Sequence, residues 1–191
     1  MTRGKPVMVL NFWEYSSSRT KRVLTIIGFL FLSLIITAAG VLTPLSSEEA
    51  NAISEETDQT RATFESMHGI QRASFIFGNN FMICLIMFVP IVGPIFGCYV
   101  LYSTGVVIAA DSIAATMNPL LVFVFLFAFP FAWLEFIAYS VALAGSFWLT
   151  WRIIQRRFRS EIVTTCLFIS ICAVTLLLAA VIEIAIIALL E

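Results

Sequence analysis

Charged residues are scarce in this chain of 191 residues, and their scarcity excludes an ordinary water-soluble domain. Only 12% of the residues are charged and 60% are hydrophobic, with a mean hydropathy of +0.99. A soluble domain is about 25% charged and about 45–50% apolar. The net charge of −1 gives no indication of nucleic-acid binding. The composition therefore predicts an integral protein of the lipid bilayer.

Residues and motifs that usually form catalytic or metal-binding sites are also few. His68 is the single histidine, so a histidine-rich metal centre cannot be built from this chain alone. The cysteines lack C-x-x-C spacing and lie in apolar stretches, as buried thiols do. They are Cys84, Cys98, Cys166 and Cys172. Glycine-rich phosphate loops and the G-x-S-x-G motif are missing as well. We therefore expect no enzyme activity, no cofactor and no metal site.

The few charges are segregated along the chain. Nine of the eleven Lys and Arg lie either before the first apolar run or in the connector 152–159. They are Arg3, Lys5, Arg19, Lys21, Arg22, Arg152, Arg156, Arg157 and Arg159. The stretch 44–72 instead carries six acidic residues against Arg61 and Arg72. By the positive-inside rule, we expect a multi-pass protein of the plasma membrane with a cytoplasmic N-terminus and an outside C-terminus.

The apolar stretches predict an all-α fold, a polytopic membrane bundle of about five transmembrane segments in a single domain, 1–191. The expected parts are a basic N-terminus 1–22, a first membrane helix 23–43, an acidic outer loop 44–72, three crossings in 73–151, the connector 152–159 and a last helix 161–190. The three crossings are placed at 79–98, 99–116 and 131–152, with a half-helix at 120–129. Broken helices are expected near Pro94 and Pro130.

Three assignments have alternatives. Residues 79–116 could form one long helix bent at Pro90 and Pro94, because proline kinks a membrane helix without necessarily ending it. The run 23–43 could be a cleaved signal peptide, although it exceeds the roughly 7–15 apolar residues of a signal core. The stretch 44–72 could be a solvated linker or a short helix laid on a partner, and its acids would suit a cationic partner or divalent ions.

Two carboxylates interrupt apolar sequence. Glu135 follows the run 120–134, and Glu183 lies within the run 179–187. A carboxylate in hydrocarbon is costly, so it is usually protonated, paired or exposed to a polar cavity. A helix rise of 1.5 Å per residue puts Glu183 about 33 Å from the cytoplasmic end of its helix, and Glu135 about 25 Å above the basic connector. We therefore expect the two side chains to be near neighbours in the outer half of the membrane.

Such a pair would share a proton, bind a cation, or accept hydrogen bonds from Asn79, Asn80 or Tyr139. We take Glu135, Glu183, Asn79 and Asn80 as the candidate binding residues. Two simpler explanations stay open. Each glutamate could hydrogen-bond backbone exposed by a broken helix, or Glu183 could merely reach the lipid headgroups.

Four short motifs in order resemble the stage II sporulation protein M family, integral membrane proteins of bacteria and archaea with about five membrane segments. The motifs are Ile76-Phe77-Gly78-Asn79-Asn80, Ser103-Thr104-Gly105, the segment 129–136 ending in Glu135-Phe136, and Ala179-Ala180-Val181-Ile182-Glu183. The family's histidine and glycine before the first glutamate are replaced around Ala132 and Trp133, and Thr104 stands where the family has asparagine. Both glutamates are retained.

The resemblance implies a non-enzymatic component of a membrane complex, because the sporulation member works within such a complex. We therefore expect an accessory subunit that packs against other membrane protein subunits through small residues such as Ala138, Ala142 and Gly145. The alternative is a small transporter or proton- or cation-coupled channel that uses Glu135 and Glu183, with the broken segments near Pro94 and Pro130 lining a cavity.

Overall fold

The computed structural model describes residues 18–190, and every regular element in that range is a helix. The helices are α2 (Ser18–Val41), α3 (Ser47–Glu65), α4 (Gly69–Met87), α5 (Val92–Ala114), α6 (Pro119–Leu126), α7 (Pro130–Ile154) and α8 (Arg159–Leu190). Five of them, α2, α4, α5, α7 and α8, are long and apolar enough to cross a membrane. The predicted all-α membrane bundle is thus confirmed. Arg3 and Lys5 of the basic N-terminus lie outside the described residues.

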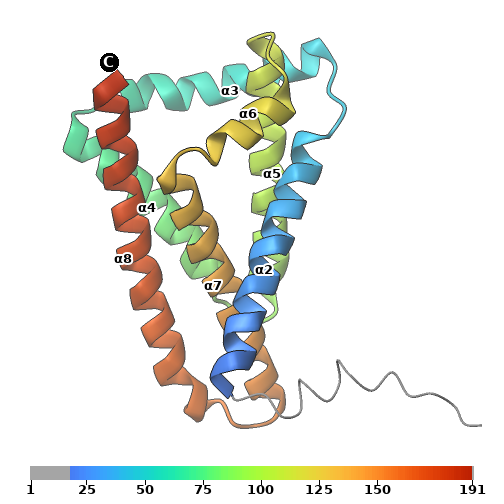
Figure 1. The fold of residues 1–191 in the computed structure, drawn as a ribbon, viewed down its shortest axis with the longest axis vertical. Coiled ribbons are helices and arrows are strands. Elements are labelled where there is room, and N and C mark those ends of the chain that lie inside the picture. The colour runs from blue at the N-terminus through green and yellow to red at the C-terminus, as the bar shows by residue number, and fades with distance from the viewer. Residues whose placement is uncertain (1–17, 191) are drawn as a thin grey trace, which may run out of the picture.

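Helix α7 forms the centre of the bundle, with α2 and α5 on one side and α4 and α8 on the other (Figure 1). It is the most buried of the five spans. The reason is its run of small side chains, which lets neighbouring helices approach closely. The fully or almost fully buried ones include Ala138, Ser140, Ala142, Ala144 and Ser146. Ala138, Ala142 and Gly145, expected from the sequence to pack against other subunits, therefore pack within this chain.

Helices α2 and α5 come into backbone contact at two glycines. A Cβ atom added to Gly40 would overlap the carbonyl oxygen of Tyr102, and one added to Gly105 would overlap the carbonyl oxygen of Thr37. Both contacts are to backbone, which cannot move aside as a flexible side chain can. Only glycine fits at these two positions.

Helices α4 and α5 are separate, and their bounds differ from the predicted 79–98 and 99–116. Helix α4 begins ten residues earlier, where the side chain of Gln71 accepts a hydrogen bond from the His68 backbone N–H at 3.0 Å. The break falls at Pro90 rather than after residue 98, because Ile91 adopts a left-handed φ of 69° and reverses the chain. Two α7 hydroxyls hold this turn: Ser146 donates to the Val89 carbonyl, and Thr150 accepts from the Ile91 N–H.

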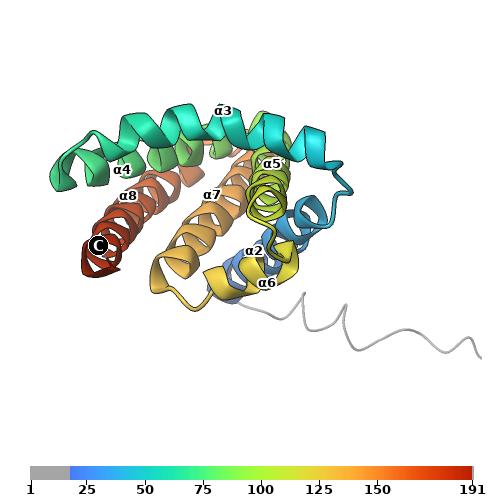
Figure 2. The same ribbon diagram turned by 90° about the horizontal axis from the view of Figure 1, so that it is seen from above.

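The stretch 44–72 is not a loop over most of its length. It holds helix α3 and the start of α4, and α3 lies across one end of the bundle, roughly perpendicular to the spans (Figure 2). Its N-terminus is closed by a capping box in which Ser46 and Glu49 bond each other's backbone N–H groups. The Ser46 N–H, together with the Ser46 hydroxyl, holds the pKa of the Glu49 carboxyl below its usual range. Of the two alternatives for this stretch, the helix is correct, and it packs on α5 of its own chain.

Helix α6 is the expected half-helix, eight residues long. Asn118 caps its first turn, accepting from the Leu120 and Leu121 N–H groups, and Pro119 occupies the position where a missing N–H costs nothing. At the break before α7, the indole of Trp133 donates to the Phe127 carbonyl at 2.9 Å. A backbone carbonyl group at the break is therefore hydrogen-bonded by an aromatic side chain.

Candidate functional site

The four candidate residues come together in one cavity, which we call the α3 chamber. It has a volume of about 360 Å³ and lies beneath α3, between α4, α7 and α8. Helix α4 contributes Asn79 and Asn80, α7 contributes Glu135 and α8 contributes Glu183. Arg61 of α3 is part of the same lining. The prediction from helix rise that the two glutamates are near neighbours agrees with this shared lining, while their depth in the membrane and their binding role stay predictions.

Glu135 has a specific partner across the chamber. The amide of Asn80 donates to its Oε1 atom at 2.6 Å, a bond that joins α4 to α7. Among the described residues Glu135 makes no hydrogen bond to backbone. The explanation that Glu135 repairs the helix break at Pro130 is therefore wrong, because Trp133 already fills that role.

Asn79 and Glu183 are less constrained. Asn79 is exposed and makes only a long contact, 3.4 Å from its amide to the Asn80 side-chain oxygen. Glu183 has neither a hydrogen bond nor an ion pair within residues 18–190. One turn below Glu135, the Tyr139 side chain is 8% exposed and its hydroxyl likewise lacks a hydrogen-bond partner in the described part of the chain. The chamber lining thus holds one hydrogen-bonded carboxylate, that of Glu135, and one without a hydrogen-bond partner among the described residues, that of Glu183.

The chamber is closed toward the middle of the bundle. Cys84, Cys172 and Leu176 are at most 1% exposed and pack with Tyr139 in the main apolar core. A solute that entered beneath α3 would therefore meet tightly packed side chains next, as protein interiors contain few voids that hold water. The geometry is that of a blind polar chamber at one end of the spans.

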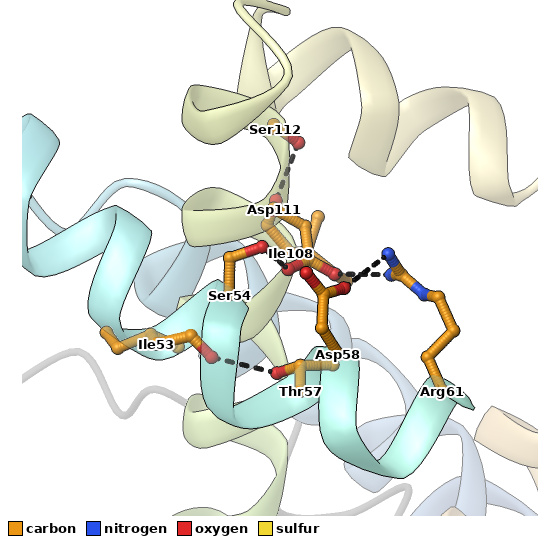
Figure 3. A network of polar contacts seen from close by, with 8 residues as sticks. All are labelled: Ile53, Ser54, Thr57, Asp58, Arg61, Ile108, Asp111 and Ser112. Carbon is orange, nitrogen blue, oxygen red and sulfur yellow. Dashed lines mark hydrogen bonds and ion pairs between the residues drawn. The ribbon is translucent and has the colours of Figure 1, made fainter. Parts of the chain in front are cut away.

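Helix α3 is fastened over the chamber by a polar network on α5 (Figure 3). Arg61 forms ion pairs at 3.1 Å with both Asp58 and Asp111. The hydroxyl of Ser54, two turns earlier on α3, donates to the other oxygen of Asp111 at 3.0 Å. Asp111 therefore ties two turns of α3 to α5. The sequence analysis did not assign Asp111, although a single acid near the end of an apolar run was a usable signal.

A second charged cluster lies at the opposite end of the bundle, and the sequence analysis missed it too. Glu161 is only 3% exposed. Its oxygens lie 2.6 Å and 2.8 Å from the Arg22 guanidinium and 3.6 Å from Arg152. The Arg22 guanidinium also lies over the Trp148 ring, 5.4 Å from its centroid. These contacts fasten together α2, α7 and α8.

Comparisons with known proteins give one match. The model of the family described as Stage II sporulation protein M matches residues 23–186. Neither the search of curated proteins nor the search of solved structures gives a match. The matched range includes both chamber glutamates and all or most of each of the five helices that could cross a membrane. The chain therefore belongs to the stage II sporulation protein M family.

Proposed function

We propose that this protein is a non-catalytic accessory subunit that binds other membrane proteins through the outward face of α4. Family membership supports an integral membrane protein, and the proposal of a subunit role depends on one further observation. Helix α4 carries a glycine, Gly78, against which no described part of its own chain packs closely.

Apart from Gly69 at the first position of α4, the glycines of the five long apolar helices fall into two groups. Five of them, Gly40, Gly93, Gly97, Gly105 and Gly145, have neighbouring atoms so close that a Cβ would overlap them. Gly28 and Gly78 have nothing within 4 Å of an added Cβ. Glycine costs a helix roughly 0.5–1 kcal/mol relative to alanine. In the first group, close packing inside the chain offsets this cost. In the second group, a close contact with a helix of another protein would explain why glycine is present.

The surroundings of Gly78 favour such a contact more than those of Gly28. On α4, exposed side chains recur every three or four residues along one face: Gln71, Ser74, Gly78, Met82 and Leu85. Ser74 and Gly78 form a small-xxx-small pair, and Gln71 supplies an amide for hydrogen bonding between helices. Gly28 instead lies among exposed large apolar residues such as Leu24, Phe31 and Leu32, a composition suited to lipid.

The test is to replace Gly78 with leucine and to identify the proteins that remain bound after gentle solubilisation. We expect Gly78→Leu to lose the companions that the parent protein retains, because a leucine keeps a partner helix from approaching. Gly28→Leu is the matched control, since it adds the same side chain at another open position. Retention of the same companions by both variants, or the lack of any companion in the parent, would contradict the docking role.

The proposed orientation puts the Glu161 end of the bundle in the cytoplasm and α3 outside the plasma membrane. The basic residues Arg152, Arg156, Arg157 and Arg159 follow α7 at the one end, and the acidic α3 covers the other. The C-terminal end of α8 lies at the same end of the bundle as α3 in Figure 1, so it would be outside as well. Labelling of single cysteines introduced at Glu56 and at Arg157 from each side of the membrane tests this orientation.

The α3 chamber favours a second candidate, a small transporter or proton- or cation-coupled channel. Glu135, Asn80 and Glu183 line one cavity between α4, α7 and α8, and carboxylates within membrane helices commonly mark the pathways of ions and protons. The closed packing below the chamber would have to open for passage. Flux into vesicles that contain the purified protein, lost in both Glu135→Gln and Glu183→Gln, would support this candidate. Flux equal to that of the parent in both variants would remove it.

A further inference from the structure

We propose that the turn between α7 and α8 binds the phosphate of an anionic phospholipid. A cavity of about 590 Å³ lies at this turn, and its lining is Arg152, Arg156, Arg157, Phe158 and Arg159. Four of the five lining residues are arginines and none is acidic. Guanidinium groups bind phosphate through paired hydrogen bonds. We call this cavity the arginine pocket. It goes beyond the docking role proposed for α4.

The backbone gathers the arginines at one place. Helix α7 ends in a turn in which the Arg156 N–H donates to the Ile153 carbonyl and the Arg157 N–H donates to the Arg152 carbonyl, each at 2.9 Å. These are the two bonds of a Schellman motif, which reverses the chain directly after the helix. Helix α8 then begins at Arg159. The turn thereby brings side chains from both helices to one cavity.

Arg156 occupies the position in this motif where glycine is usual. Its φ is 55°, in the left-handed region, and glycine adopts that region without steric cost. A backbone requirement alone would therefore favour glycine. The arginine is better explained by what its side chain does, because it adds a fourth guanidinium to the pocket.

The nearest acid, Glu161, pairs with Arg152, one of the four pocket arginines. Glu161 lies two residues after Arg159, but its side chain is only 4% exposed and is engaged by Arg22 and Arg152 inside the bundle. Arg156 and Arg159 form no ion pair with a described residue, so these two guanidinium groups are left for an external anion. Clusters of four to eight basic residues beside a membrane helix attract anionic lipids.

The apolar surroundings point to a lipid rather than to a soluble anion. Trp151, Ile154 and Phe158 are exposed by 49%, 70% and 45%, and they adjoin the arginines in sequence. Tryptophan at the end of a span is typical of the headgroup level. A ligand at this place can put its phosphate among the guanidinium groups and its acyl chains against these side chains, which neither inorganic phosphate nor an acidic protein segment can do.

The test measures lipid binding by the full-length protein in mild detergent. Thermal unfolding and native mass spectrometry are followed while phosphatidylglycerol, phosphatidylcholine or inorganic phosphate is added. We expect phosphatidylglycerol to bind and to raise the melting temperature, with little effect of the other two. At about fivefold in affinity for each basic residue, Arg156→Gln with Arg159→Gln should weaken binding by about 25-fold. Arg19→Gln, an exposed arginine at the same end but outside the pocket, should change it little.

Arg156→Gly separates binding from folding. Glycine suits the left-handed turn, so this variant should unfold at the same or a higher temperature in phosphatidylcholine yet respond about fivefold more weakly to phosphatidylglycerol. The proposal is overturned if Arg19→Gln weakens binding as much as the pocket variants do. It is also overturned if inorganic phosphate protects as well as the lipid, if an acidic protein rather than lipid is retained, or if phosphatidylglycerol binds all variants equally.

Discussion

Replacing Gly105 with alanine is expected to destabilise the protein more than any other single methyl addition in the α2–α5 contact. The new Cβ would overlap the Thr37 carbonyl oxygen and lie 2.9 Å from both the Gly40 Cα and the Val41 nitrogen. All three atoms are backbone, so only a separation of α2 from α5 makes room. Overpacking costs about 1–3 kcal/mol and sometimes more. We expect a loss near the upper limit of about 3 kcal/mol, measured by unfolding in detergent.

The matched control is Gly28→Ala on the same helix pair. Gly28 has open space around its Cβ position, and alanine is favoured over glycine inside a helix by roughly 1 kcal/mol. This variant should therefore be unchanged or slightly more stable. Equal unfolding of Gly105→Ala and Gly28→Ala would show that α2 and α5 do not approach each other as described.

Replacing Glu161 with glutamine is expected to cost about as much, for an electrostatic reason. The substitution keeps the size of the side chain but leaves Arg22 and Arg152 without their buried countercharge. Breaking a buried ion pair by removing one partner costs about 3–5 kcal/mol, because the remaining charge stays buried without compensation. The free energy of unfolding should fall by about that amount, and α2 should lose its contact with α8.

Two comparisons separate this explanation from a general effect of charge. Asp58→Asn removes an ion pair whose two side chains are 52% and 59% exposed, so it should cost at most about 1 kcal/mol. Glu161→Leu combined with Arg22→Met removes both charges and should recover part of the loss. A double variant that is less stable than Glu161→Gln would contradict the uncompensated-charge explanation.

The candidate site was the more predictable part of this molecule, and the reason is geometric. In a membrane helix, the rise per residue converts sequence position directly into depth, so Glu135 and Glu183 could be matched although 48 residues separate them. Asn80 could be named as a donor because polar residues in hydrocarbon need partners. Which atom bonds which, and that Trp133 rather than Glu135 repairs the helix break, depends on side-chain directions that the rise alone does not give.

Helix α3, which covers the α3 chamber, could have been predicted more fully from the sequence. Ser46-Ser47-Glu48-Glu49 has the spacing of a capping box, which signals the start of a helix. The acidic composition of the stretch hid that signal, since it is also typical of solvated linkers. The break at Pro90 was harder to place, because Pro90 and Pro94 allow either a bend or a stop. The outcome depends on Ser146 and Thr150 of α7, which hold the turn from a distant part of the sequence.

The Arg22–Glu161 ion pair also has a consequence for the synthesis of the protein. The two partners are 139 residues apart, and a ribosome adds about 5–20 residues per second. Glu161 is therefore synthesised roughly 7 to 28 seconds after Arg22. In that interval the long side chain of Arg22 can remain at the water boundary. The ion pair between α2 and α8 would thus form only when translation is nearly complete. A truncated chain that lacks Glu161 would leave α2 without this contact.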